Sequence, residues 1–213
     1  HEIGNPVTAI ACLAQNLDSE TDAEEQLESS QQILEQTRRI TRIVESLVTF
    51  SHSGGIKHSQ HVPVNIRDTV DEAISLLLLD PDHRQQPFTN QCEPEHWVQG
   101  DPQRLLQVFI NLLGNAADAS ADKQPVTVRC ESADEVLDVI VEDQGHGIPD
   151  ELRDALFEPF VTSKPPGRGT GLGLALVYSI IEEHFGSISV ESPICDAGGT
   201  RFIIRLPIHA TSL

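Results

Sequence analysis

Gly167-Arg-Gly-Thr-Gly-Leu-Gly-Leu174 is the most informative stretch of the chain, because its glycines lead directly into an apolar segment with helical spacing. A second glycine motif, Asp143-Gln-Gly-His-Gly-Ile-Pro149, follows a run of strand-forming residues. Glycines let a backbone pass close to a ligand, and the first N–H groups of a helix attract anions. Neither motif contains the Gly-Lys-Ser/Thr of a Walker A loop. A single Gly-x-Gly is also compatible with an ordinary turn.

The segment that contains the first of these motifs is basic within an acidic protein. Residues 157–173 carry Lys164 and Arg168 against Glu158, a net charge of +1 in a chain of 213 residues whose net charge is −19. A flexible basic loop beside the N-terminus of a helix is suited to binding negative charge. We therefore predict that this segment forms a lid over a polyphosphate.

Two asparagines interrupt the apolar run of residues 108–117. Asn111 and Asn115 stand four residues apart, which places them on one face of a helix. Asparagine is a mediocre helix former, so two of them in one apolar helix need a reason. They are either half-exposed polar residues or oxygen ligands facing a hydrated Mg²⁺ and phosphates, since Mg²⁺ takes few direct protein ligands.

The first part of the chain is typical of two antiparallel helices. The first helix is predicted up to Leu17, with apolar residues spaced 4-3-4-3 at Ile3, Val7, Ile10, Ala14 and Leu17. A second helix is predicted over residues 23–52 and should end at Gly54-Gly55. A lone hairpin cannot bury both apolar stripes, so we expect two copies to pair as a four-helix bundle. Residues 51–61, rich in Ser, Gly and His, are predicted to be a linker.

Beyond the linker, short strand-like runs alternate with helices. The predicted helices cover residues 67–79, 101–120 and 174–185, and the predicted strands cover residues 62–66, 88–92, 96–98, 126–131, 136–143, 188–192 and 200–206. Strands and helices in this proportion indicate a two-layer α/β sandwich in which helices cover one face of a mixed sheet. The predicted fold class is therefore α+β, a helical hairpin followed by an α/β sandwich.

The composition excludes several classes of protein. The chain has 14 Lys and Arg against 33 Asp and Glu, whereas a nucleic-acid binder needs clustered cations. Its longest apolar run, residues 73–79 with one serine in it, is far shorter than the roughly 20 residues of a membrane span. Because the chain starts at His1 and contains no Met, we expect it to be part of a longer cytoplasmic protein, with any inner-membrane anchor upstream.

The four cysteines are scattered and show no metal-ligand spacing. We favour small buried or half-buried side chains in a reducing compartment over a disulfide. The residues concerned are Cys12, Cys92, Cys130 and Cys195.

Six motifs resemble those of sensor histidine kinases and occur in the order of that family. They are His1-Glu-Ile-Gly-Asn-Pro6 (H-box), Asn111-Leu-Leu-Gly-Asn-Ala-Ala-Asp-Ala119 (N-box), Asp143-Gln-Gly-His-Gly-Ile-Pro149 (G1 box), Phe157-Glu-Pro-Phe-Val-Thr-Ser-Lys164 (F-box), Gly169-Thr-Gly-Leu-Gly-Leu174 (G2 box) and Gly198-Gly-Thr200 (closing motif). The Thr-Ser-Lys-Pro and Asn-Ala-Ala-Asp-Ala variants look most like the nitrogen-regulation branch of the family.

This resemblance implies two domains and several partners. Residues 1–55 would form a dimerisation and phosphoacceptor hairpin, and residues 61–213 would form a Bergerat-type ATP-binding domain. The implied cofactors are ATP and Mg²⁺. The implied partners are a second copy of the chain and the receiver domain of a response regulator, with no nucleic acid.

The resemblance also implies roles for single residues. Asp143 would bind the adenine amino group, with Thr200 assisting through water, and Asn115 would be the Mg²⁺ ligand. Gly145 and Gly147 would admit the base and ribose, and Lys164 and the G2 backbone would hold the phosphates. The full set of expected nucleotide-binding residues is Asn111, Asn115, Asp143, Gly145, Gly147, Ile148, Phe157, Thr162, Lys164, Arg168, Gly169, Thr170, Gly171, Leu172, Gly173 and Thr200.

The imidazole of His1 is predicted to face solvent, because His1 lies about 200° around the helix from the seam that begins at Ile3. A neutral imidazole keeps a lone pair that can attack a phosphoryl group, and Glu2 is suited to accept the proton of the other ring nitrogen. In the family, the residue four positions after the histidine orients water to dephosphorylate the receiver, which would be Asn5 here. The expected catalytic residues are therefore His1, Glu2 and Asn5.

The function that follows is ATP-dependent autophosphorylation of His1 and transfer to an aspartate of a response regulator, with a reverse phosphatase activity. Asn111 stands where related ATPases of the gyrase and Hsp90 type carry a glutamate that activates water. Asparagine cannot take a proton from water, so we predict slow hydrolysis of ATP. The alternatives are a stand-alone ATP hydrolase of that class and a non-catalytic dimerising scaffold.

Overall fold

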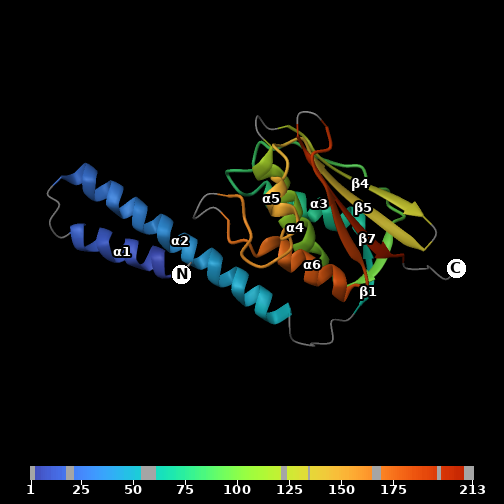
Figure 1. Cartoon of the computed structure of the whole chain (residues 1–213), viewed down its shortest axis with the longest axis horizontal. Coiled ribbons are helices and arrows are strands. Elements are labelled where there is room, and N and C mark those ends of the chain that lie inside the picture. Colours follow the sequence, from blue (N-terminus) through green and yellow to red (C-terminus); the bar gives the residue numbers. More distant parts are fainter. Residues whose placement is uncertain are drawn as a thin grey trace.

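The computed structural model describes residues 3–17, 22–53, 61–120, 124–133, 135–164, 169–195 and 198–208. It confirms the predicted fold class, because a hairpin of two helices projects from a two-layer α/β domain (Figure 1). None of the helices in the described part of the chain is both long and apolar enough to cross a membrane.

The hairpin consists of α1 (Gly4–Leu17) and α2 (Ala23–Ser53), which lie side by side and antiparallel (Figure 1). Packing of one helix on the other covers only part of each apolar stripe. Val7 of α1 is 50% exposed and Leu34 of α2 is 56% exposed. Gly54 and Gly55, which were expected to end the second helix, lie outside the described residues.

The α/β domain is built on a mixed sheet of five strands. In spatial order they are β2 (Phe88–Asn90), β4 (Val126–Ala133), β5 (Val136–Asp143), β7 (Thr200–Pro207) and β6 (Ser187–Glu191). β2 pairs with β4 in parallel, and the other neighbours are antiparallel. A separate antiparallel pair joins β1 (Val62–Asn65) to β3 (Trp97–Gly100).

Three helices cover one face of this sheet, as predicted (Figure 1). They are α3 (Ile66–Leu77), α4 (Pro102–Ala119) and α6 (Gly173–Glu183). The ends of the predicted helices and strands of this domain differ from the observed ends by at most two residues. The sequence did not predict α5 (Asp150–Arg153), because one helical turn is too short to show a hydrophobic period.

The core lies between the three helices and the sheet. Strand alternation supplies one wall, because Leu137, Val139 and Val141 of β5 are buried beneath the helices. The opposite wall includes Phe109 of α4 and Ile180 of α6, both fully buried. Burial of these apolar side chains is the main favourable contribution to the stability of this domain.

The N-terminus of helix α4 is capped by Asp101, which is bonded in turn to His184. The carboxylate of Asp101 accepts hydrogen bonds from the backbone N–H groups of Gln103 and Arg104, at 3.0 and 3.2 Å. The N–H of Asp101 donates to Nε2 of His184 at 2.9 Å, and the other ring nitrogen bonds the carbonyl of Ile180. Burial lowers the pKa of His184, so the ring stays neutral and joins the start of α4 to the end of α6.

The prediction that the cysteines are unpaired was wrong for two of them. Cys92 and Cys130 form a disulfide with their Cα atoms 5.0 Å apart. The parallel pairing of β2 with β4 brings these residues together, although 38 positions separate them in the sequence. Cys12 and Cys195 are exposed rather than buried. The cysteine pattern therefore no longer indicates a reducing compartment.

Replacing Phe109 by alanine tests the core. Phe109 is among the largest fully buried side chains, so Phe109→Ala should lower the free energy of unfolding by about 3–5 kcal/mol. Leu79→Ala is the control, because Leu79 is 72% exposed and its removal should change that free energy by about 0.5 kcal/mol at most. Urea denaturation followed by circular dichroism measures both. Equal losses in the two variants would contradict this packing.

Candidate nucleotide site

One face of α4 lines the region where the predicted motifs meet. Asn111, Asn115 and Ala119 lie at i, i+4 and i+8 on this helix and span about 12 Å along its axis. Asn111 faces the start of α6, and Asn115 is bonded to the F-box. Ala119 contacts the G1 loop. The helix therefore brings three distant motifs into one row.

The buried acidic group of the site is at the end of β5. Asp143 is only 3% exposed, and its Oδ1 accepts a hydrogen bond from the N–H of Gly145 at 2.8 Å. Burial raises the pKa of Asp143, although the N–H groups of Gly145 and Thr200 act in the opposite direction. Thr200 lies opposite Asp143 in the β5–β7 register and is also buried. The two residues assigned to adenine by resemblance are thus adjacent.

The backbone geometry explains why the G1 box has glycine at two positions. A Cβ atom on Gly145 would lie 2.4 Å from the carbonyl oxygen of Ala119, so only glycine fits against the end of α4. Gly147 has φ of 75°, a conformation that favours glycine. Both observations explain why the loop needs glycine before any ligand is considered.

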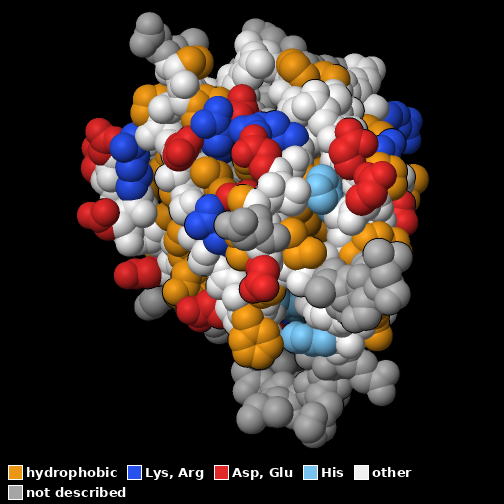
Figure 2. Space-filling view, turned by 90° about the vertical axis from the view of Figure 1, so that its right-hand side faces the viewer, with side chains coloured by type: hydrophobic (Ala, Val, Ile, Leu, Met, Phe, Trp, Pro, Cys, Tyr) orange, Lys and Arg blue, Asp and Glu red, His pale blue; other side chains and the backbone are white. Residues whose placement is uncertain are grey.

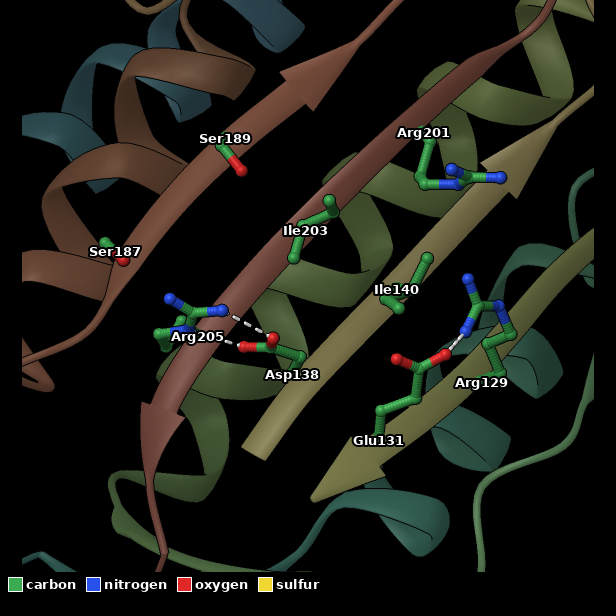
Figure 3. A pocket seen from close by; sticks show the side chains of 9 residues that line it. All are labelled: Arg129, Glu131, Asp138, Ile140, Ser187, Ser189, Arg201, Ile203 and Arg205. Atoms are coloured by element: carbon green, nitrogen blue, oxygen red, sulfur yellow. Dashed lines mark hydrogen bonds and ion pairs between the residues drawn. The ribbon is translucent and has the colours of Figure 1, made fainter. Parts of the chain in front are cut away.

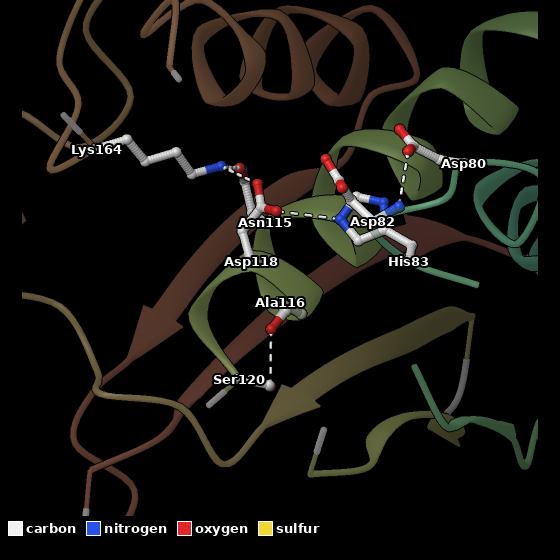
Figure 4. Close-up of polar contacts among 8 residues, drawn as sticks. All are labelled: Asp80, Asp82, His83, Asn115, Ala116, Asp118, Ser120 and Lys164. Carbon is white, nitrogen blue, oxygen red and sulfur yellow. Dashed lines mark hydrogen bonds and ion pairs between the residues drawn. The ribbon is translucent and has the colours of Figure 1, made fainter. Parts of the chain in front are cut away.

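Lys164 of the F-box is bonded to α4. Its Nζ donates to Oδ1 of Asn115 at 3.0 Å and to Oδ2 of Asp118 at 2.6 Å (Figure 4). On the other side, Nε2 of His83 lies 3.1 Å from Oδ1 of Asp118. Burial alone would raise the pKa of Asp118, but the hydrogen bonds and charges of Lys164 and His83 lower it below its usual value. Two oxygen atoms therefore already hold a cation at this point.

The G2 box closes the row at the start of α6. Gly171 has φ of 65°, and a Cβ there would lie 2.3 Å from the backbone of Phe160. A Cβ on Gly173 would lie 3.0 Å from Oδ1 of Asn111. No side chain caps the N-terminus of α6, whose N-cap residue is Leu172. The first N–H groups of this helix can therefore receive an anion.

Other predicted residues of the site have identifiable contacts. Thr162 Oγ1 accepts a hydrogen bond from the N–H of Lys164, and Thr170 Oγ1 accepts one from the N–H of Leu172. Phe157 packs against Tyr178 of α6. Gly169 lies against the side chain of Thr162. Arg168 falls outside the described residues.

The phosphoacceptor region is described only in part. His1 and Glu2 lie outside the described residues. Asn5, Thr8 and Cys12, which share the helix face assigned to His1, are all exposed. The described part of this face is therefore open to solvent.

The structure adds three polar residues that the sequence did not indicate. Ser192 Oγ accepts a hydrogen bond from the N–H of Ile148 at 2.8 Å and donates one to the carbonyl of Gly199 at 3.0 Å. It therefore joins the G1 loop to the β6–β7 turn. Asp118 and His83 flank Lys164, as described above. Only Asp118 stood in a recognised motif, and nothing in that motif indicates its partners.

A pocket of about 310 Å³ lies elsewhere, on the face of the sheet away from the helices (Figure 3). Ile140 and Ile203 are at its centre, and Arg205 is paired with Asp138 at its side. None of the predicted site residues lines this pocket. From the side that lies to the right in Figure 1, basic side chains are interleaved with acidic ones rather than gathered in a patch of one sign (Figure 2). We therefore assign the candidate site to the row along α4.

Two protein-family models match the chain. Residues 100–210 match the model of the histidine kinase-, DNA gyrase B- and HSP90-like ATPases, and residues 1–55 match that of the histidine kinase A phosphoacceptor domain. The fold and the site thus define an ATP-binding domain of this ATPase class, preceded by a phosphoacceptor hairpin.

Curated relatives share both domains. The chain is 36% identical over 236 residues to the sensory histidine kinase/phosphatase NtrB of Rhodobacter capsulatus, covering all of this chain and 61% of that protein. It is 32% identical to the sensor histidine kinase ZraS of Escherichia coli K12, covering 99% of this chain and 44% of ZraS. The chain belongs to the sensor histidine kinase family, and it spans about half the length of these relatives.

Solved structures show the same architecture. Histidine kinase ThkA in complex with the response regulator protein TrrA is matched with a TM-score of 0.79 and 26% identity, over 98% of this chain and 59% of ThkA. Acinetobacter baumannii histidine kinase AdeS is matched with a TM-score of 0.76 over 98% of both chains, and at 23% identity this shows the fold alone.

The pH dependence of stability tests the environment of Asp143. A carboxyl whose pKa is raised in the folded chain contributes stability below its unfolded pKa and loses it as pH rises through the raised value. Asp143→Asn has no such loss. The free energy of unfolding of the variant, relative to the unmodified chain, should therefore rise between about pH 3 and pH 7, by about 1.4 kcal/mol for each unit of pKa shift.

Asp138→Asn is the control of opposite sign. The hydrogen bond from Arg205 lowers the pKa of Asp138, so its carboxylate contributes stability above its unfolded pKa. Relative to the unmodified chain, this variant should lose stability as pH rises. Urea denaturation at a series of pH values measures both variants. A difference for Asp143→Asn that stays constant with pH would contradict the raised pKa.

Proposed function

We propose that the chain uses ATP to phosphorylate His1 and passes the phosphoryl group to an aspartate of a response regulator. The observation that supports this most is the row along α4, in which one helix face contacts the G1 loop, the F-box lysine and the start of α6. Such a row offers a buried acceptor at one end and cationic and N–H donors along the rest. An adenine nucleotide has the matching order of groups.

The nucleotide would lie with its base at the β5 end of the row. Asp143 would accept a hydrogen bond from the adenine amino group, assisted by Thr200 through water. Lys164 and the uncapped N-terminus of α6 would hold the phosphates. Phosphoryl transfer depends mainly on positioning and neutralisation of charge, and these groups supply both.

Mg²⁺ fits the donor set at this point of the row, because Asn115 and Asp118 oxygens already hold the ammonium group of Lys164. Asn115 would be its protein ligand. When bound, the ion would neutralise charge on the phosphate oxygens. Most of its remaining ligands would be water and phosphate, as is usual for Mg²⁺.

The transfer step needs a nucleophile and a base. A neutral imidazole nitrogen of His1 would attack the γ-phosphorus, the bond from that phosphorus to the β–γ bridging oxygen would break, and ADP would leave. Glu2 would accept the proton of the other ring nitrogen. Asn5, exposed on the same helix, would later orient water to hydrolyse the phosphorylated receiver.

Partners and domain limits follow from the same proposal. Residues 1–55 would be the phosphoacceptor domain and residues 61–213 the ATP-binding domain.

Exposed apolar side chains on α1 and α2, such as Val7 and Leu34, would be covered by a second copy in a four-helix bundle. ThkA is solved with a response regulator, which supports a receiver domain as partner here. The need for ATP supports the cytoplasm as the compartment of the reaction.

The two alternatives are less well supported. A stand-alone hydrolase would need a base near the attacking water, and Asn111 cannot take a proton. Its Nδ2 instead donates to the carbonyl of Gln107 at 2.9 Å. A non-catalytic scaffold would not need the bonded row of site residues along α4.

Incubation with γ-labelled ATP separates the three functions. We expect acid-labile, alkali-stable label on the chain, because phosphohistidine has that stability, and we expect none on His1→Gln. His61→Gln should keep the label. Free phosphate without labelled protein would identify a hydrolase, and neither product would identify a scaffold.

The phosphatase role of Asn5 has its own test. Asn5→Ala should lower dephosphorylation of the partner receiver by about a hundredfold, the size of effect expected when the group that positions a reacting water is lost. Autophosphorylation should be unchanged, because Asn5 takes no part in attack on ATP. Rates of receiver dephosphorylation and of labelling measure the two activities. An equal loss of both would argue against separate roles.

A further inference from the structure

Asp118 is a negative charge placed next to the proposed phosphate site. It lies one turn after Asn115 on α4, and its side chain is 43% exposed. A carboxylate repels phosphate groups at short range. A helix that only had to bind phosphates would be better served by a neutral or basic residue, so Asp118 needs an explanation.

The contacts of Asp118 supply one. One carboxylate oxygen accepts from Lys164 at 2.6 Å, and the other lies 3.1 Å from Nε2 of His83 (Figure 4). His83 comes from the turn after α3 and is only 15% exposed, and its Nδ1 is buried without a hydrogen-bond partner. The imidazole is therefore placed mainly by packing, and within the described residues its polar partner is Asp118. Asp118 is thus held from one side and holds Lys164 on the other.

Lys164 itself belongs to the F-box, where its backbone N–H donates to Thr162 Oγ1. Its ammonium carries three N–H donors, and the bonds to Asn115 and Asp118 use two of them. A third donor remains for an acceptor such as a phosphate oxygen. Lysine side chains are long and lose much rotamer freedom when fixed. A lysine already fixed at the site binds a phosphate more tightly than a free one.

We propose that Asp118 is a positioning residue for Lys164, and that His83 orients Asp118 for this task. The pair keeps the lysine ammonium beside Asp118 before nucleotide arrives, so that Lys164 loses less side-chain freedom when the polyphosphate binds. This inference rests on the proposed function, since it concerns the same nucleotide site. It predicts that the carboxylate strengthens binding of a polyanion that it would otherwise repel.

The sign of the effect makes the inference testable. We would measure, by calorimetry on the full chain with Mg²⁺ present, the affinities of a non-hydrolysable ATP analogue and of AMP. Asp118→Asn should lower the affinity for the ATP analogue about tenfold, which corresponds to the loss of one hydrogen bond to a charged group. AMP should bind unchanged, because it lacks the outer phosphates. Unchanged AMP binding also shows that the variant is folded.

Two further variants isolate the pathway through Lys164. In a Lys164→Met background, Asp118→Asn should cause no further loss, because the group that it positions is gone. His83→Gln should also lower the affinity for the analogue, but by less than Asp118→Asn does. Asp138→Asn is the matched control, because it removes a carboxylate paired with arginine on the outer face of the sheet.

The possible results are distinct. An affinity for the analogue that is unchanged or raised in Asp118→Asn would overturn the inference, as would an equal loss for AMP and analogue. The inference would also be overturned if Asp118→Asn lowered the affinity as much in the Lys164→Met background as in the unmodified chain. If the unmodified chain bound neither nucleotide, both the proposed function and this inference would fail.

Discussion

Helix α4 packs into the core with one side and carries residues of the candidate site on the other. The rest of the structure depends on this double role. Its apolar side, with Phe109 among its fully buried residues, is packed against the sheet and the neighbouring helices. Its polar side carries Asn111 and Asn115. A helix packed at interior density cannot rotate without opening cavities. The positions of the polar residues are therefore a consequence of core packing, and the site is as rigid as the core beneath it.

The remaining parts of the site are loops attached to this helix. The G1 loop lies against the end of α4 at Ala119, where only glycine fits, and Ser192 ties the same loop to the β6–β7 turn. The F-box is attached through Lys164. Loops that are fastened at a few points can still move between them. In the proposed function, Asp143 and the bonded Lys164 would be the fixed points of the site, and the loop backbone between such points could adjust when a nucleotide enters or leaves.

The charged side chains are arranged differently on the outer face of the sheet and near the candidate site. The chain has a net charge of −19, and the outer face of the sheet has its arginines paired with carboxylates. Near the site, Lys164 is paired as well, with Asp118, and in our proposal this carboxylate positions the lysine. An acidic protein that binds a polyanion has to concentrate and orient its few cations, since distant ones are screened by salt.

The sequence by itself determined the elements whose signals are local. Hydrophobic periods predicted every long helix and strand, and the spacing of Asn111 and Asn115 placed both on one helix face, because a helix repeats every few residues. Only the tertiary structure decided what meets across the chain. The disulfide of Cys92 with Cys130 follows from the pairing of β2 with β4, and the contacts of Asp118 with Lys164 and His83 join three segments. Such contacts depend on register and on the packing of distant segments, which no local pattern of residues records.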